Sequence, residues 1–133
     1  MQVTGGATHL RHSPRKVNLV VKTIVGLPVD SAEERLDITL RRARDPITTV
    51  LKQAIANAVN NFKLDRTKLI VKEAYATKGR TLKRGLMGGR SHYKPFQRTA
   101  SHLTIKLESI NRHSREGGNP SRVIPSEVEG SKS

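Results

Sequence analysis

The first half of the chain carries apolar residues at the spacing of amphipathic helices. The first such stretch begins with Ser13, which is a favourable helix cap, and Pro14, which suits the first helical position. Gly26 and Pro28 end it. Its apolar positions recur at intervals of three and four residues, namely Val17, Val20, Val21, Ile24 and Val25. This spacing predicts a helix between Pro14 and Gly26 that buries one face.

Two further helices are predicted downstream. Asp30, followed by Glu33 three residues later, resembles a capping box and starts the second helix. The inner face expected for that helix consists of Ala32, Leu36, Leu40 and Ala43. The third helix has Asp45 as its cap and Pro46 at its first position. Its apolar stripe continues through Ile47, Val50, Leu51, Ala54, Ile55, Ala58, Val59 and Phe62. A stripe of this length predicts the central helix of the core.

After Asp65 the apolar period changes from that of a helix to that of a strand. Leu69–Val71 begins one strand, and Leu103, Ile105 and Leu107 alternate with polar residues in another. The glycine-rich, basic segment between them has no helical period. The simplest interpretation is one long β-hairpin that turns near Gly88 and Gly89.

The length of the predicted hairpin means that it projects from the domain. Arms of about fifteen residues reach roughly 50 Å at ~3.3 Å per residue, whereas a domain of ~100 residues has a radius of gyration near ~13 Å. The outer half has only Leu82, Leu86 and Met87 as sizeable aliphatic residues, so it cannot form a core of its own. We therefore expect a partner to order the hairpin.

The 133 residues are predicted to form one domain and a tail. The domain covers residues 1–109, with the hairpin extension at about residues 76–100. The tail, residues 110–133, is rich in Ser, Gly and Pro and has no apolar period, so it is predicted to be disordered.

Composition excludes several classes of protein. There is no Cys, which removes disulfide scaffolds, thiolate metal sites and cysteine nucleophiles. No apolar run approaches the ~20 residues of a membrane-spanning helix, and the N-terminus lacks a signal pattern, so a cytoplasmic protein without membrane insertion is expected. The net charge of +14 is typical of a protein that binds nucleic acid.

Most of the excess charge lies in one segment. Residues 30–73 carry nine basic and seven acidic side chains, but no acid occurs between Glu73 and Glu108. Within that interval are eight basic residues, namely Lys78, Arg80, Lys83, Arg84, Arg90, Lys94, Arg98 and Lys106. Because a solvated surface normally mixes both signs of charge, this run indicates a surface that contacts phosphates.

Two further groups of residues have more than one interpretation. Tyr93 and Phe96 either stack on unpaired bases or pack over the neighbouring strand. The basic residues around the first helix form either a second backbone-binding patch or an ordinary solvated face, and they are Arg11, Arg15, Lys16 and Lys22. The scattered histidines, including His92 and His102, are interpreted as surface or RNA-contacting residues.

Nothing in the sequence indicates catalysis. There is no P-loop, dinucleotide fingerprint, acidic metal cluster or nucleophile–base pair, so we expect no enzyme, no metal and no cofactor. Two alternatives to RNA binding stay open. One is a nucleoid-type protein with the hairpin as a minor-groove arm, and the other, more remote, is a nuclease.

Four blocks of sequence, in order, resemble the bacterial large-subunit ribosomal protein L-twenty-two (L22) family. They are SPRKVNLVVKTIVG, AIANAVNNF, KGRTLKRG and RTASHLTIKL, and the resemblance covers about three-quarters of the chain, from Leu10 to Leu107. It implies an α+β fold, with three helices packed on a small antiparallel sheet, an edge strand near Thr8–Leu10 and a long projecting β-hairpin.

The resemblance also implies a structural protein of the large ribosomal subunit. Its partners would be large-subunit rRNA, neighbouring ribosomal proteins and, at the hairpin tip, the nascent peptide in the exit tunnel. The residues expected to bind rRNA are Arg11, Arg15, Lys16, Lys78, Arg80, Lys83, Arg84, Arg90, His92, Tyr93, Lys94, Arg98 and His102. Those expected to line the tunnel are Lys83, Arg84, Gly85, Leu86, Met87, Gly88, Gly89 and Arg90.

Overall fold

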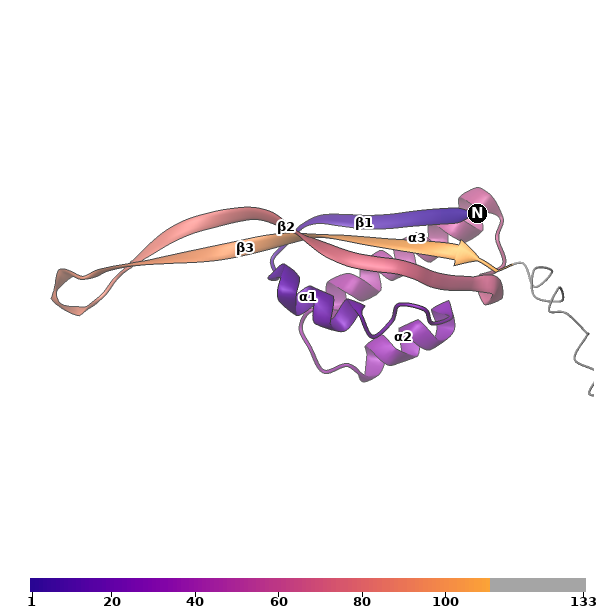
Figure 1. Ribbon diagram of the computed structural model, residues 1–133, viewed down its shortest axis with the longest axis horizontal. Helices are drawn as coiled ribbons and strands as arrows, with labels where there is room; N and C mark the ends of the chain where they lie inside the picture. The colour runs from indigo at the N-terminus through magenta and orange to yellow at the C-terminus, as the bar shows by residue number, and fades with distance from the viewer. Residues whose placement is uncertain (111–133) are drawn as a thin grey trace, which may run out of the picture.

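A computed structural model describes residues 1–110, which form three helices and a three-stranded antiparallel sheet with the strand order β1-β3-β2 (Figure 1). The elements are β1 (Gln2–Leu10), α1 (Pro14–Val21), α2 (Val29–Ile38), α3 (Arg44–Phe62), β2 (Leu69–Met87) and β3 (Tyr93–Ser109), with single 3-10 turns at Arg66–Lys68 and Gly89–Ser91. The predicted α+β fold with a long hairpin is confirmed. Of the predicted tail, residues 110–133, only Ile110 is described, and its N–H donates to the carbonyl oxygen of Lys68 at 2.9 Å; the remainder lies outside the described residues.

The core lies between the helices and one face of the sheet. Leu103, Ile105 and Leu107 alternate along β3 with less buried residues, so one face of that strand is covered, as their spacing predicts. α3 packs on β1 and β3, and α1 packs on β2. The helices contribute buried residues at the predicted spacing, among them Val17, Val20, Val21, Ile47, Leu51 and Ala54.

The edge strand that the resemblance implies near Thr8–Leu10 is present and begins at Gln2. Its backbone lies very close to α3 at Gly5. A Cβ atom on Gly5 would lie 2.7 Å from the Cβ of Ala54 and 3.1 Å from the carbonyl oxygen of Val50. Glycine at this position therefore allows β1 and α3 to approach closely.

The first helix is shorter than predicted. α1 ends at Val21, and Val25, which was expected on the apolar stripe, is 41% exposed. The chain leaves the helix because Gly26, at φ +82°, and Leu27 pair with β2: the N–H of Gly26 donates to Val71 at 2.8 Å, and the N–H of Val71 donates to Leu27 at 3.0 Å. Hydrogen bonds to the sheet therefore replace a further turn of helix.

The second helix also differs from its prediction at both ends. Pro28, not Asp30, occupies the cap position, and α2 begins at Val29. Arg66 binds Asp30 and Glu33, at 2.9 and 2.6 Å. Leu40 is 96% exposed rather than part of the inner face, because α2 ends at Ile38 and the backbone of the following residue is extended.

The third helix begins one residue before its predicted cap and exposes its last apolar positions. α3 starts at Arg44, so Asp45 lies in the first turn, and Val59 and Phe62 are exposed. The chain reverses at Lys63, which has φ +51°, and the N–H of Leu64 donates to Ala58 at 3.2 Å. Leu64 then packs against the core.

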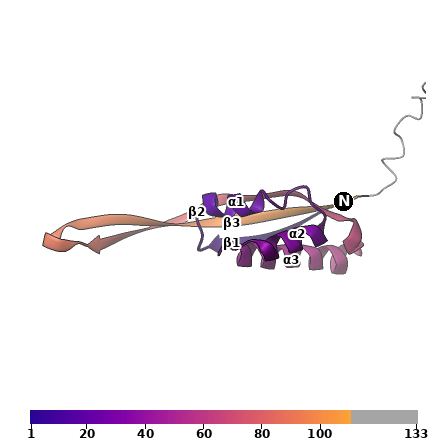
Figure 2. The same ribbon diagram turned by 90° about the horizontal axis from the view of Figure 1, so that it is seen from below.

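Beyond the sheet, β2 and β3 continue as a two-stranded ribbon away from the helices (Figures 1 and 2). Pairing of β1 with β3 ends at Leu10 and Ser101, and a register shift in β2 between Lys78 and Thr81 lies just beyond it. The ribbon turns through Gly88–His92, as predicted. Its aliphatic residues are exposed, with Met87 at 77%, so the ribbon has no core.

One side chain of α1 binds the outer edge of β2 close to the point where the ribbon begins. The amide of Asn18 donates to the carbonyl oxygen of Ala76 at 3.0 Å, and the N–H of Ala76 donates to Asn18 Oδ1 at 2.7 Å. Asn18 therefore substitutes for a neighbouring strand at this residue and fixes α1 against the base of the hairpin.

Replacing Asn18 by Ala should lower the free energy of unfolding by about 1–3 kcal/mol, because two hydrogen bonds of ~0.5–1.5 kcal/mol each are lost. The amide hydrogen of Ala76 should also exchange faster. Asn60→Ala is the control, since Asn60 is exposed on α3, and it should leave stability nearly unchanged. Chemical denaturation and hydrogen exchange measure both effects. If the two variants lose the same stability, the Asn18 contact does not stabilise the fold.

Candidate nucleic-acid interface

Charged residues are distributed unequally between the body of the protein and the ribbon. Among residues 1–110, every ion pair lies in the body or at the base of the sheet, and none includes a basic residue between Lys78 and Arg98. The pairs are Arg44–Asp45, Arg66–Asp30, Arg66–Glu33, Lys68–Asp65, Lys72–Glu108 and Lys106–Glu73. Within the part of the chain that the structure describes, the ribbon therefore presents its cations without neutralising partners.

In contrast to the cations of the ribbon, the carboxylates of Glu73 and Glu108 in the sheet are paired with lysines. A hydrogen bond from Lys106, reinforced by its charge, lowers the pKa of Glu73, and a hydrogen bond from Lys72 lowers the pKa of Glu108. The stabilising effect of each pair is present above the ordinary pKa of Glu and is lost as the pH falls through the lowered value. At neutral pH these two lysines are occupied within the protein, so they are poor candidates for binding phosphate.

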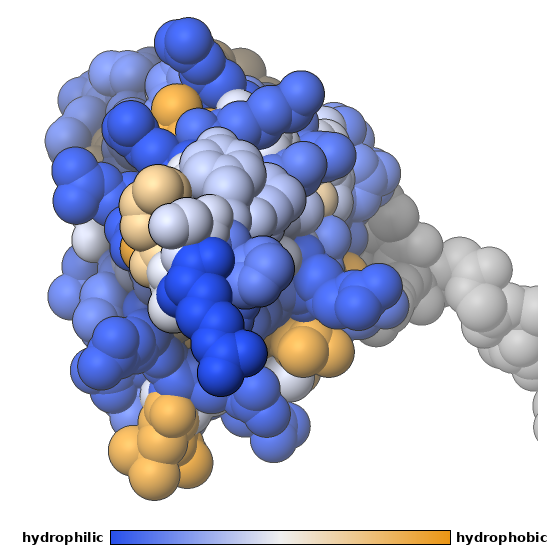
Figure 3. Space-filling view, turned by 90° about the vertical axis from the view of Figure 1, so that its left-hand side faces the viewer, coloured by the Kyte–Doolittle hydropathy of each residue, from blue (hydrophilic) through white to orange (hydrophobic). Residues whose placement is uncertain are grey.

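The register of the ribbon places basic side chains on both of its faces. Directly opposite residues share a face, and Arg84 pairs with Phe96 while Leu82 pairs with Arg98. Lys83, which pairs with Gln97, lies on the other face. Viewed from the tip, the surface is mainly hydrophilic, and hydrophobic residues form only small separate patches (Figure 3). A ribbon charged on both faces suits a site enclosed by anions.

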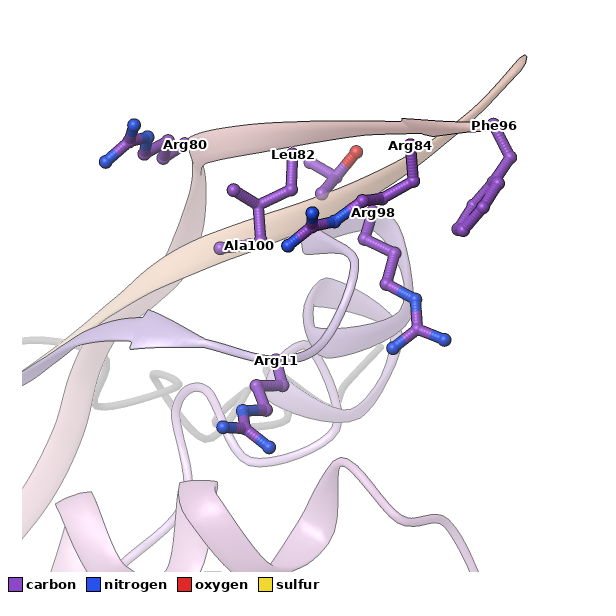
Figure 4. Close-up of a pocket in the computed structure, with 8 residues that line it drawn as sticks. Arg11, Arg80, Leu82, Arg84, Phe96, Arg98 and Ala100 are labelled. Carbon is purple, nitrogen blue, oxygen red and sulfur yellow. The ribbon is translucent and has the colours of Figure 1, made fainter. Parts of the chain in front are cut away.

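An open groove of about 730 Å³ lies where the ribbon leaves the body (Figure 4). Its lining consists of Arg11, Arg80, Leu82, Arg84, Phe96, Arg98, Thr99 and Ala100, with no acidic residue among them. Arg84 and Arg98 extend from the hairpin, and Arg11 lies in the segment between β1 and α1 with its side chain directed away from the hairpin (Figure 4). We call this the arginine groove.

The two aromatic residues of the ribbon have different surroundings. Phe96 is half-buried in the arginine groove, and the guanidinium carbon of Arg98 lies 5.9 Å from the centre of its ring. Tyr93 is 65% exposed, and its ring occupies the space that a side chain on Gly85 would fill. Of the two predicted interpretations, packing over the neighbouring strand therefore applies to Tyr93.

The remaining predicted site residues are distributed over three places. Arg15 and Lys16 are exposed in the first turn of α1 and do not line the groove. Lys78, Lys83, Arg90, His92 and Lys94 are exposed along the ribbon and at its tip. His102 is half-buried at the base of the ribbon, where its Nδ1 atom accepts the N–H of His9 at 3.2 Å. Through this hydrogen bond, His102 on β3 also contacts the backbone of β1.

The proposed tunnel-lining residues form the outer end of the ribbon. Residues 83–90 run from the last part of β2 into the turn, and all are exposed except Gly88, which is half-buried. Arg90 and Ser91 adopt left-handed backbone conformations, with φ of +57° and +62°. The N–H of Gly88 donates to the carbonyl oxygen of His92 at 2.7 Å and closes the turn.

Sequence reasoning missed two features of this region. It treated Arg11 as part of a helix patch, whereas the pairing of β1 with β3 brings Arg11 to the groove. It gave Asn18 no role, because nothing in a helical pattern shows that a polar residue faces a strand edge. Within residues 1–110 there is no group of three side chains able to hold a metal ion, and no helix there is long and apolar enough to cross a membrane.

The fold and this surface together define a class: an α+β domain with a long basic β-ribbon. Comparison with known proteins identifies the family. The family described as Ribosomal protein L22p/L17e matches residues 6–108. The chain belongs to this family of ribosomal proteins, which confirms the resemblance seen in the sequence.

Relatives from three bacteria carry the name Large ribosomal subunit protein uL22. The relative from Deinococcus radiodurans is 42% identical over 99 residues, which are 74% of this chain and 74% of that protein. The relative from Clostridium tetani is 40% identical over 108 residues, which are 81% of this chain and 97% of that protein. The relative from Desulfitobacterium hafniense is 40% identical over 99 residues, which are 74% of this chain and 87% of that protein.

Proposed function

We propose that this protein is a structural constituent of the large ribosomal subunit, located in the cytoplasm, that binds large-subunit rRNA and supports subunit assembly. The observation that carries the proposal is the unpaired charge of the ribbon and the arginine groove. The name shared by the bacterial relatives assigns them to the same subunit. Neighbouring ribosomal proteins are further partners in this role, which involves no catalytic step.

The mechanism is electrostatic and geometric. Each basic side chain that neutralises a phosphate releases counterions, which is the main source of affinity for a polyanion. Because cations lie on both faces of the ribbon, rRNA segments on either side bind it at once, and the ribbon is held between them. Arg11, Arg15 and Lys16 extend the interface to the body of the protein. The bound rRNA then supplies the contacts that a two-stranded ribbon lacks on its own.

We also assign the ribbon tip to the wall of the peptide exit tunnel, where it meets the nascent peptide. The support is the position of residues 83–90 at the end of the ribbon, far from the body (Figure 1), together with family membership. Leu86 and Met87 are exposed there beside Lys83 and Arg84. The tip thus offers both apolar and cationic contacts to a passing chain.

The first test is sedimentation of a cell lysate through a sucrose gradient after a high-salt wash, with mass spectrometry of each fraction. Loosely bound basic proteins are removed by salt, because every phosphate contact makes affinity fall with salt concentration. We expect the protein to stay with the large subunit at one copy per particle. Recovery in free or DNA-bound fractions would contradict the proposal, and equal competition by double-stranded DNA would favour a nucleoid-type role.

A further inference from the structure

We propose that the arginine groove binds one unpaired nucleotide of a single-stranded RNA segment, with its base against the ring of Phe96 and its neighbouring phosphates on the arginines. This inference rests on the proposed function, since it specifies the form of RNA that the groove recognises. The groove, and not the ribbon as a whole, would then distinguish single-stranded RNA from duplex.

The charges of the groove point to an anion. Four arginines, Arg11, Arg80, Arg84 and Arg98, line a single groove, with Arg84 and Arg98 beside its aromatic residue and Arg80 directed outward (Figure 4), and none of them takes part in an ion pair among residues 1–110. Like charges gathered in this way repel one another, and a bound anion relieves the repulsion. The planar, five-donor guanidinium matches the oxygen atoms of a phosphate better than a lysine does. Phosphates are therefore the expected charged ligands.

The apolar part of the lining points to a base. Leu82, Phe96 and Ala100 share the groove with the arginines. A phosphate alone would make no favourable contact with these apolar side chains. In A-form duplex RNA the base faces are stacked inside the helix, whereas an unpaired nucleotide presents its face to a protein aromatic ring. A groove with both components suits a nucleotide whose base and phosphates are accessible together.

Phe96 is the aromatic residue placed for this contact. It lies opposite Arg84 in the ribbon, and the guanidinium carbon of Arg98 lies 5.9 Å from the centre of its ring, so one cation contacts the ring. Figure 4 shows the ring at the outer end of the groove, directed away from the ribbon. Tyr93 lies on the opposite face, packed over Gly85, and is the natural comparison.

The absence of Trp from the chain makes a direct test possible. In the full-length Phe96→Trp variant the introduced indole is the one fluorophore of its kind, and stacking with a base quenches its emission. The probes are a nine-nucleotide oligoadenylate, an abasic nine-mer of equal charge and a blunt duplex RNA. Of the three probes, we expect only oligoadenylate to quench the indole emission strongly. The fluorescence anisotropy of a label at the end of each RNA should show that all three bind.

Tyr93→Trp is the matched control and should show much weaker quenching with the same probes. A second pair of variants measures affinity. Phe96→Leu should weaken oligoadenylate binding about tenfold, in the range known for loss of one base–aromatic stack, and should change abasic binding less than about twofold. Gln97→Leu, on the other face, should change neither.

The outcomes separate this inference from the proposed function. Equal quenching of the two Trp variants, or equal weakening of all three probes by Phe96→Leu, would overturn the nucleotide site while leaving rRNA binding intact. Failure of the unmodified chain to bind any of the RNAs, with its loss from the large subunit, would overturn both.

Discussion

Replacing Lys83 and Arg84 together by glutamate should release most of the protein from the large subunit at a salt concentration that retains the unmodified chain. The two residues lie on opposite faces of the ribbon, paired with Gln97 and Phe96, so the variant reverses charge on both sides. Loss of two phosphate contacts lowers the salt slope of RNA binding by about 1.4–1.8 and lowers the affinity roughly 15- to 30-fold near 0.15 M salt. Repulsion by the new carboxylates weakens binding further.

The matched control is Lys52→Glu with Lys63→Glu, which makes the same change in net charge on exposed residues of the body. Its retention on the subunit and its salt slope should stay close to those of the unmodified protein. Gradient sedimentation and RNA binding at several salt concentrations provide both quantities. Equal losses in the two double variants would mean that total charge, and not the ribbon, determines binding.

A large loss of stability is also expected from Gly5→Ala. The added Cβ would meet the Cβ of Ala54 at 2.7 Å and the backbone oxygen of Val50 at 3.1 Å, so α3 or β1 must shift. Overpacking of this kind costs about 1–3 kcal/mol of unfolding free energy. Thermal and chemical denaturation measure the loss.

Gly6→Ala is the appropriate comparison, because Gly6 is exposed on the other face of β1 and its nearest contact is the carbonyl oxygen of Leu103 at 3.3 Å. The Gly6→Ala variant should lose less than about 1 kcal/mol of unfolding free energy, because a small displacement relieves the contact. If Gly6→Ala costs as much as Gly5→Ala, the loss arises from glycine replacement in the strand and not from the packing of α3.

Local patterns predicted which elements form, but tertiary contacts determined where they end. Cap residues, prolines and apolar spacing were sufficient to place all three helices and the hairpin. Val25 and Leu40 continued an apolar period by sequence and are nevertheless exposed, because the chain leaves α1 to pair with β2 and leaves α2 in an extended conformation. A helical period contains no information about a competing strand.

The candidate interface was predictable to a similar extent. The long run of basic residues without an acidic one was enough to predict that the ribbon is the candidate interface, because the charge of each residue is known from the sequence. The arginine groove was not predictable, because Arg11 reaches it through the pairing of β1 with β3, and Arg84 shares a face with Phe96 and Arg98 because of the register in which β2 and β3 pair. Both depend on pairing between segments far apart in the chain.

The charge on both faces of the ribbon has a consequence for the cell. A ribbon with cations on both faces can contact an RNA strand on each side at once, and a net charge of +14 attracts RNA independently of its sequence. Under the proposed function, we expect chains in excess over rRNA to bridge separate RNA strands and condense them. A proportionate supply of the protein and of rRNA is the condition under which this bridging would not occur.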